Sequence, residues 1–224
     1  YECVLGVKYS SQTEAFRDRF RALPVLDVYV AAIPDKFKYK ALYPKQRDKE
    51  VRSVKNDEVR KHKYFAWKLL EYALKHTFGY EIDHLKLTKA PSGKWICSNC
   101  ELSISHSGKL VAVALSRNPV GVDIQIEKNI ASSTFECRMF TQKEQEHLAE
   151  ICCDKTRSNE LLKLWAKKES IFKTLNSDKY IPAEIETSDR DAYVESVVFE
   201  GVTYHLAVAG VDISKIRIFK DVIL

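Results

Sequence analysis

Residues 120–128, VGVDIQIEK, alternate apolar and polar side chains, and this alternation constrains the fold more than any other stretch of the chain. A period of two residues is typical of a β-strand with one buried face. The apolar side chains would face a core, whereas Asp123, Gln125 and Glu127 would share the opposite face. That polar face is either a solvated surface or part of a site for a hard cation, whose preferred ligands are oxygen atoms.

The composition is that of a soluble globular protein. Of the 224 residues, 45% are hydrophobic and 30% are charged, which is enough for one sizeable domain or two halves that share a core. The longest apolar runs, such as LVAVALS, are too short to cross a bilayer, so we expect no membrane association. The first residues, YECVLGVKYS, lack the pattern of a secretory signal, and we expect a cytoplasmic protein. A net charge of +5 is compatible with phosphate-bearing partners.

The cysteines do not predict a complete metal site. Cys97-Ser-Asn-Cys100 has the spacing of half a zinc site, but a second pair of this kind is missing. We therefore interpret all the cysteines as reduced thiols. They are Cys3, Cys97, Cys100, Cys137, Cys152 and Cys153.

Periodicity and turn residues predict a mixture of strands and helices that is typical of the α+β class. The expected strands cover residues 1–9, 25–33, 84–89, 101–107, 109–116, 120–128, 192–200, 202–210 and 215–221. The expected helices cover residues 10–23, 45–76, 134–152 and 158–175, with a break in the second near Asn56 and its end at Gly79. This order favours two α+β halves, residues 1–115 and 116–224, over a parallel βαβ arrangement.

The helix expected at 158–175 carries a carboxylate beside its apolar stripe. Glu169 follows Trp165 by four positions and precedes Phe172 by three, so it lies at the margin of the buried face. A carboxylate in that position is costly unless a cation or hydrogen-bond donors meet it. Lys173 lies one turn further on, and the alternative interpretation is an ordinary surface ion pair between Glu169 and Lys173.

The strand and the helix together could form a cation site. If the helix packs on the polar face of the strand, Asp123 and Glu169 converge, and two carboxylates with water and phosphate oxygens are a usual Mg²⁺ site. Gln125 would lie roughly 6.6 Å along the strand from Asp123, so it would reach the same ion directly or through water. Lys173 beside the ion would neutralise a phosphate, and this arrangement favours chemistry on a diphosphate.

Four stretches in series resemble the signature motifs of the 4′-phosphopantetheinyl transferases. Their order and approximate spacing agree with those of the long, surfactin-synthetase-activating type, over roughly residues 45 to 205. The stretches are PSGKW at 91–95, LSISHSG at 102–108, VGVDI at 120–124 and WAKKESIFK at 165–173. Two departures are Gln125, where many relatives carry Glu, and NSDKY at 176–180, where relatives often carry a glycine-rich turn.

The resemblance implies a fold and a reaction. The fold would be a pseudo-twofold monomer of two similar α+β halves, each a small antiparallel sheet packed with helices, with the active site in the cleft between them. The reaction would transfer the phosphopantetheine arm of coenzyme A to a serine of an apo acyl or peptidyl carrier protein, as in fatty-acid, polyketide or nonribosomal-peptide synthesis. Adenosine 3′,5′-bisphosphate would be released, and no nucleic acid would be bound.

The resemblance also implies roles for particular residues. Asp123 and Glu169 would hold Mg²⁺, or Mn²⁺ in its place, with Gln125, Glu127 or water completing the shell. Glu169 would also take the proton of the carrier serine, directly or through water, and Lys173 would stabilise charge on the leaving group. The residues expected to contact coenzyme A are Arg47, Arg52, His62, Lys63, Lys94, Ser105, His106 and Lys173.

Two other functions remain compatible with the sequence. Asp123, Glu127 and Lys128 loosely match the acid-x-lysine pattern of an Mg²⁺-dependent nuclease. The basic stretch at 45–63, KQRDKEVRSVKNDEVRKHK, could instead be a solvated helix face or a nucleic-acid-binding surface. A nucleic-acid-binding module would bind with a steep dependence on salt and would tolerate changes at Asp123.

Overall fold

The computed structural model describes residues 25–91, 93–130, 133–175, 177, 179–211 and 213–224. The strand expected at 1–9, the helix expected at 10–23 and Cys3 lie outside the described residues. Among the helices that the structure describes, none combines the length and the apolar character needed to cross a membrane.

The chain forms a mixed α+β fold with small sheets, as expected. The helices are α2 (Lys45–Ser53), α3 (Asp57–Phe78), α4 (Ser133–Met139), α5 (Gln142–Ala149) and α6 (Asp154–Thr174). The strands are β1 (Leu26–Ala32), β2 (Leu87–Lys89), β3 (Trp95–Cys97), β4 (Glu101–Ser107), β5 (Leu110–Ser116), β6 (Val120–Ile126), β7 (Ala192–Phe199), β8 (Val202–Gly210) and β9 (Ile216–Val222).

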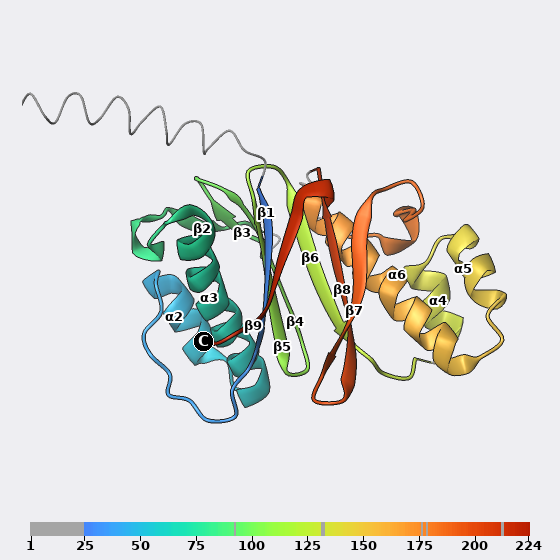
Figure 1. The fold of residues 1–224 in the computed structure, drawn as a ribbon, viewed down its shortest axis with the longest axis horizontal. Coiled ribbons are helices and arrows are strands. Elements are labelled where there is room, and N and C mark those ends of the chain that lie inside the picture. The colour runs from blue at the N-terminus through green and yellow to red at the C-terminus, as the bar shows by residue number, and fades with distance from the viewer. Residues whose placement is uncertain (1–24, 92, 131–132, 176, 178, 212) are drawn as a thin grey trace, which may run out of the picture.

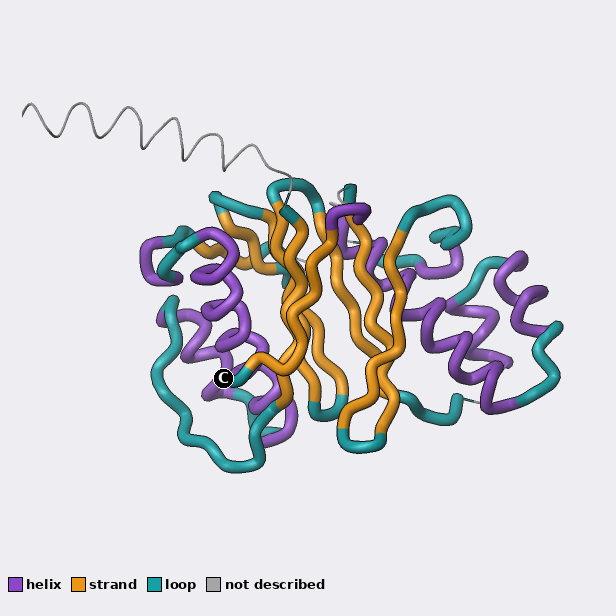
Figure 2. The backbone as a smooth tube through the Cα atoms, in the orientation of Figure 1, coloured by secondary structure: helices purple, strands orange, loops and turns teal. Residues whose placement is uncertain are grey.

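Two sheets lie in the middle of the molecule, with helices on either side (Figures 1 and 2). The first sheet has the strand order β4-β5-β1-β9 and the second has the order β6-β8-β7, while β2 and β3 form a separate ribbon. Helices α2 and α3 lie beside the first sheet, and α4, α5 and α6 lie beyond the second (Figure 1).

Strand β9 modifies the expected antiparallel arrangement. It comes from the C-terminal end of the chain but pairs with β1, and the two strands run parallel. The other pairings in both sheets are antiparallel. The first sheet therefore contains strands from both sides of the predicted boundary between residues 115 and 116.

Helix ends follow local capping chemistry. Asn56 caps α3 by accepting the Val59 N–H at 3.0 Å, and Gly79 ends the helix with a φ of +70°. The prediction of one helix over 134–152 is wrong, because Thr141 begins a new helix, α5. Its hydroxyl accepts the Glu144 N–H, and the Glu144 carboxylate accepts the Thr141 N–H.

The apolar face of β6 lies where the alternation predicts. Val120, Val122 and Ile124 are fully buried against residues of the first sheet such as Val28, in a core between the two sheets. The opposite face is not a solvated surface, because α6 covers it. At Gly121 a Cβ atom would lie 1.8 Å from the Ser170 carbonyl oxygen, so only glycine allows this approach of helix and strand.

Three serines join the two sheets along their facing edges. The hydroxyls of Ser103, Ser105 and Ser107 on β4 accept the backbone N–H groups of Val122, Ile124 and Ile126 on β6, at 2.9, 3.3 and 2.9 Å. We call these three residues the serine ladder. They satisfy N–H groups that an edge strand would otherwise leave without partners.

The serine ladder generates a stability prediction. Ser103→Ala should lower the free energy of unfolding by about 1–3 kcal/mol, because it leaves the buried Val122 N–H without an acceptor. Urea denaturation would measure the change. Ser98→Ala is the matched control, since its exposed hydroxyl contacts only the Asn99 side chain among the described bonds, and it should change stability little. Equal losses in the two variants would contradict a structural role for the ladder.

Candidate active site

Asp123 is the buried centre of a hydrogen-bonded group. The residue is only 3% exposed, in the middle of β6. Its Oδ1 accepts the Ser105 hydroxyl at 2.7 Å and the Lys173 ammonium at 2.7 Å, and its Oδ2 accepts the Gln125 amide at 2.7 Å. A buried carboxylate requires such donors, so the fold of β4, β6 and α6 positions this charge.

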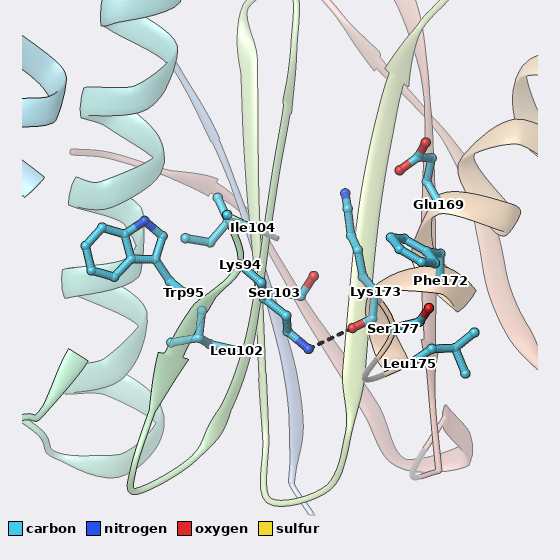
Figure 3. Close-up of a pocket in the computed structure, with 11 residues that line it drawn as sticks. Lys94, Trp95, Leu102, Ser103, Ile104, Glu169, Phe172, Lys173, Leu175 and Ser177 are labelled. Atoms are coloured by element: carbon cyan, nitrogen blue, oxygen red, sulfur yellow. Dashed lines mark hydrogen bonds between the residues drawn. The ribbon is translucent and has the colours of Figure 1, made fainter. Parts of the chain in front are cut away.

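Lys173 pairs with Asp123, and the alternative of a Glu169–Lys173 surface pair is wrong. The Lys173 ammonium also donates to the Val122 carbonyl at 2.9 Å, so the side chain crosses from α6 to β6. Glu169 is held more loosely, by a 3.4 Å contact from the Trp165 indole N–H. In Figure 3, Glu169 and Lys173 extend from neighbouring turns of α6 toward the same end of the pocket.

A cavity of about 260 Å³ lies beside this group. Lys94 and Trp95 from the β2–β3 ribbon and Ser103 from β4 line one wall, while Glu169 and Lys173 line the other (Figure 3). Lys94 reaches across and donates to the Lys173 backbone carbonyl at 2.9 Å. Sites that enclose a drug-sized ligand usually exceed about 300 Å³, so a ligand as large as a coenzyme would extend beyond this cavity.

Tyr180 belongs to the site, although the sequence analysis did not predict it. Its hydroxyl is buried beside the Glu169 carboxylate, without a well-formed hydrogen bond to it. Burial raises the pKa of Tyr180, and the negative charges of Glu169 and Asp123 raise it further. Both carboxylates therefore act on one hydroxyl, which supports their convergence. The only sequence signal was the departure NSDKY from the glycine-rich turn.

Two histidine rings stack near Asp123, whose charge acts on His106. The rings of His62 and His106 are 4.7 Å apart and nearly parallel. His62 donates from Nε2 to the Gly108 carbonyl at 2.5 Å, which fixes its tautomer. His106 keeps solvent access, yet desolvation and the electrostatic effects of His62 and Lys173 lower its pKa. His106 is therefore a neutral hydrogen-bonding group near pH 7.

The Glu50 carboxylate accepts hydrogen bonds from three cations, Arg47, Lys63 and Lys89. We call these four residues the Glu50 cluster. Arg47 donates to one Glu50 oxygen at 3.0 Å, while Lys63 and Lys89 donate to the other at 3.0 and 2.9 Å. Burial would raise the pKa of Glu50, but the bonds from Lys89, Lys63 and Arg47 outweigh it and lower the pKa to about 2. Lys89 was not among the residues that the sequence predicts to contact coenzyme A.

The two predicted arginines differ in position. Arg47 is 5% exposed, donates to the Lys63 carbonyl at 2.7 Å, and lies 4.8 Å over the Trp67 ring. Its two terminal nitrogens already donate to Glu50 and to the Lys63 carbonyl, whereas its Nε is buried without a partner. Arg52 is exposed and pairs with Asp48 at 2.7 Å, apart from the Glu50 cluster.

The carboxylates of Asp123 and Glu169 have the chemistry of ligands for a hard cation. Within the described ranges, no group of three or more His, Cys, Asp or Glu side chains is arranged to hold a metal. Mg²⁺ nevertheless commonly binds one or two carboxylates together with water and substrate phosphates, and Asp123 and Glu169 supply that chemistry. Binding at Asp123 Oδ1 would require the Lys173 ammonium to leave that oxygen. Glu127 is held elsewhere, by Thr203 and Asn159.

Comparison with known proteins supports a transferase. Residues 119–209 match the family model described as the 4′-phosphopantetheinyl transferase superfamily. The match covers under half of the chain, from β6 almost to the end of β8, and includes Asp123, Glu169, Lys173 and Tyr180. A search among curated proteins found no match to the chain.

The Glu50 cluster generates a pH prediction. Glu50 has a pKa of about 2 in the folded protein against 4.5 without partners. Its contribution to stability is therefore complete above about pH 4.5 and is lost as the pH falls toward 2. Glu50→Gln should lower the free energy of unfolding by about 2–3 kcal/mol at neutral pH. This difference from the wild type should disappear in acid. Urea denaturation at several pH values would measure it, with the exposed Glu58→Gln as control. A gap that does not depend on pH would contradict the cluster's role.

Proposed function

We propose that this protein transfers the 4′-phosphopantetheine arm of coenzyme A to a serine of an apo acyl or peptidyl carrier protein, with Mg²⁺. The observation that carries the proposal is the buried Asp123–Lys173 pair beside a pocket lined by Glu169, inside the segment that matches the transferase superfamily. The long surfactin-synthetase-activating type, with two pseudo-twofold halves, one active-site cleft and a cytoplasmic monomer, is part of the same proposal.

Asp123 and Glu169 would hold the metal, and Gln125 or water would complete its shell. Bound Mg²⁺ supplies neutralising charge to the coenzyme's diphosphate. Ser105 and Gln125 orient the Asp123 carboxylate through their 2.7 Å hydrogen bonds. Ser105 therefore acts on Asp123 in this proposal rather than on a phosphate.

Lys173 and Glu169 would carry out the transfer step. Lys173 holds its ammonium 2.7 Å from Asp123 Oδ1, where it would bind a diphosphate oxygen and stabilise charge on the leaving group. A serine hydroxyl is a weak nucleophile until a base takes its proton. Glu169 is available for that role, because its contact with Trp165 is long and its side chain lines the pocket.

The remaining coenzyme contacts would follow a line of positive charge. The charges of Lys63, Lys173 and Asp123 all act on His106, so this ring is near both the Asp123 group and Lys63 of the Glu50 cluster. Lys94, His106 and Lys63 would bind phosphates along this line. Arg47 and His62 would support it from buried positions, and Arg52 is the outermost candidate.

The alternatives gain no support from the described residues. Arg47, Arg52 and Lys63, from the basic stretch at 45–63, are each paired with a carboxylate of the same stretch. This pairing reduces the free charge that a nucleic-acid surface or a nuclease would need. Lys128, the lysine of the nuclease pattern, lies 5.1 Å over the Trp165 ring, so a cation–π contact already holds its ammonium.

The metal proposal predicts loss of transfer without loss of fold. Incubated with coenzyme A, Mg²⁺ and an apo carrier protein, the wild type should add one phosphopantetheine mass to the carrier, as measured by mass spectrometry. Asp123→Asn and Glu169→Gln preserve side-chain size and should slow this addition on the order of 100-fold or more. Circular dichroism would check their fold.

Glu127→Gln is the matched control and should transfer normally, because Glu127 contacts Thr203 and Asn159. Normal transfer by both Asp123→Asn and Glu169→Gln would overturn the assignment of the metal ligands. A panel of carrier proteins from fatty-acid, polyketide and peptide synthesis would identify the natural acceptor class.

Tyr180→Phe separates a functional role from a structural one. Because the Tyr180 hydroxyl is buried beside Glu169 without a well-formed hydrogen bond, its removal should leave stability unchanged or slightly increased. If the hydroxyl donates to Glu169 or to the substrate, the transfer rate should fall by about tenfold, the value of one hydrogen bond. Thermal unfolding and the same mass assay would measure both. A stability loss with unchanged transfer would contradict this role.

A further inference from the structure

The turn that joins β3 to β4 contains two cysteines that the proposed reaction does not use. Cys97 ends β3, Cys100 precedes β4, and each is only 7% exposed in the core that packs against α3. The Ser98 N–H donates to the Lys86 carbonyl at 3.4 Å, and Arg117 donates to the Asn99 carbonyl at 2.8 Å. The turn is therefore held from both sides.

The two thiols lie three residues apart in one turn, interact with each other and have different environments. The Cys100 thiol donates a hydrogen bond to the Cys97 sulfur, which also accepts the backbone N–H groups of Asn99 and Cys100. These bonds lower the pKa of Cys97 to about 6, whereas the same contact and burial raise the pKa of Cys100. Cys97 is thus a thiolate near pH 7, and Cys100 is a neighbouring thiol.

A metal would fit this pair poorly. A structural zinc ion takes four ligands, usually cysteine and histidine. The part of the chain that the structure describes contains no group of three or more candidate ligands. The positive charge of Arg117 also acts on Cys100, which opposes a cation at the pair.

We propose that Cys97 and Cys100 form a reversible intramolecular disulfide when the protein meets a peroxide. The Cys97 thiolate attacks a peroxide oxygen and the O–O bond breaks, giving a sulfenic acid and hydroxide, which takes up a proton to become water. The Cys100 sulfur then attacks the Cys97 sulfur, the S–O bond breaks, and a second water leaves with the Cys100 proton. Two thiols and one hydrogen peroxide thus give one disulfide and two waters.

This chemistry is independent of phosphopantetheine transfer, although it would occur close to the candidate active site. Trp95, on the same short strand as Cys97, lines the pocket, and Ser103 and Ser105 follow Cys100 on β4. A disulfide would fix the conformation of the turn that joins β3 to β4.

The sequence allows a direct test on the full chain. Trypsin cleaves after Lys94 and Lys109, so both cysteines lie on one peptide, residues 95–109, that contains no other cysteine. The reduced protein is treated with hydrogen peroxide, blocked with iodoacetamide, digested and analysed by mass spectrometry. The expected peptide is unalkylated and lighter by two hydrogens, and dithiothreitol before blocking should restore two alkylated cysteines. The rate of its formation should rise as the pH passes through about 6.

Variants distinguish the two roles. In Cys100→Ser, Cys97 should stop at a sulfenic acid that dimedone traps, and in Cys97→Ser oxidation of Cys100 should be much slower. Cys137→Ser changes an exposed thiol in the other half of the molecule and should leave the disulfide unaffected. The proposal is overturned if Cys97 and Cys100 stay alkylatable while Cys137 is oxidised, or if native mass spectrometry of the untreated protein finds zinc that is lost in Cys97→Ser.

Discussion

The serine ladder between β4 and β6 is the interaction on which the rest of the structure depends. The two sheets meet edge to edge, and the edge of β6 would carry unpaired N–H groups without the hydroxyls of Ser103, Ser105 and Ser107. Ser105 has a second role, because the hydroxyl that accepts the Ile124 N–H donates its own proton to Asp123. The same side chain thus joins the two sheets and orients the central carboxylate of the candidate site.

The buried charge of Asp123 explains why α6 lies where it does. A carboxylate that is 3% exposed needs a cation, and Lys173 on α6 supplies one at 2.7 Å. Helix and strand can come this close because position 121 is glycine. Since Glu169 lies one turn before Lys173, the contact that neutralises Asp123 also brings a second carboxylate to the pocket wall. The contact that packs α6 on β6 therefore also assembles the candidate site.

The Glu50 cluster shows how a half-buried acidic residue can organise nearby positive charge. The sequence suggested free cations at 45–63, but Arg47 and Lys63 are tied to Glu50, together with Lys89 from the β2–β3 ribbon. Cations fixed in advance lose less side-chain entropy when they meet a phosphate. The ribbon that contributes Lys89 also contributes Lys94 to the pocket and ends in the Cys97–Cys100 turn, so these features share one short piece of backbone.

The sequence by itself determined what depends on neighbours along the chain: the strand at 120–126 and its apolar face, the cap at Asn56, the end at Gly79 and the motifs that resemble a transferase family. A closer reading of Thr141 and Glu144 as a capping box would also have divided the helix expected at 134–152. Only the tertiary structure decided that Lys173 pairs with Asp123, fifty positions away, instead of Glu169. It also decided that β9 joins β1, that Ser105 contacts Asp123 and that Tyr180 lies near both carboxylates. The physical reason is that periodicity and capping act over a few residues, whereas the partner of a buried charge depends on which elements pack together.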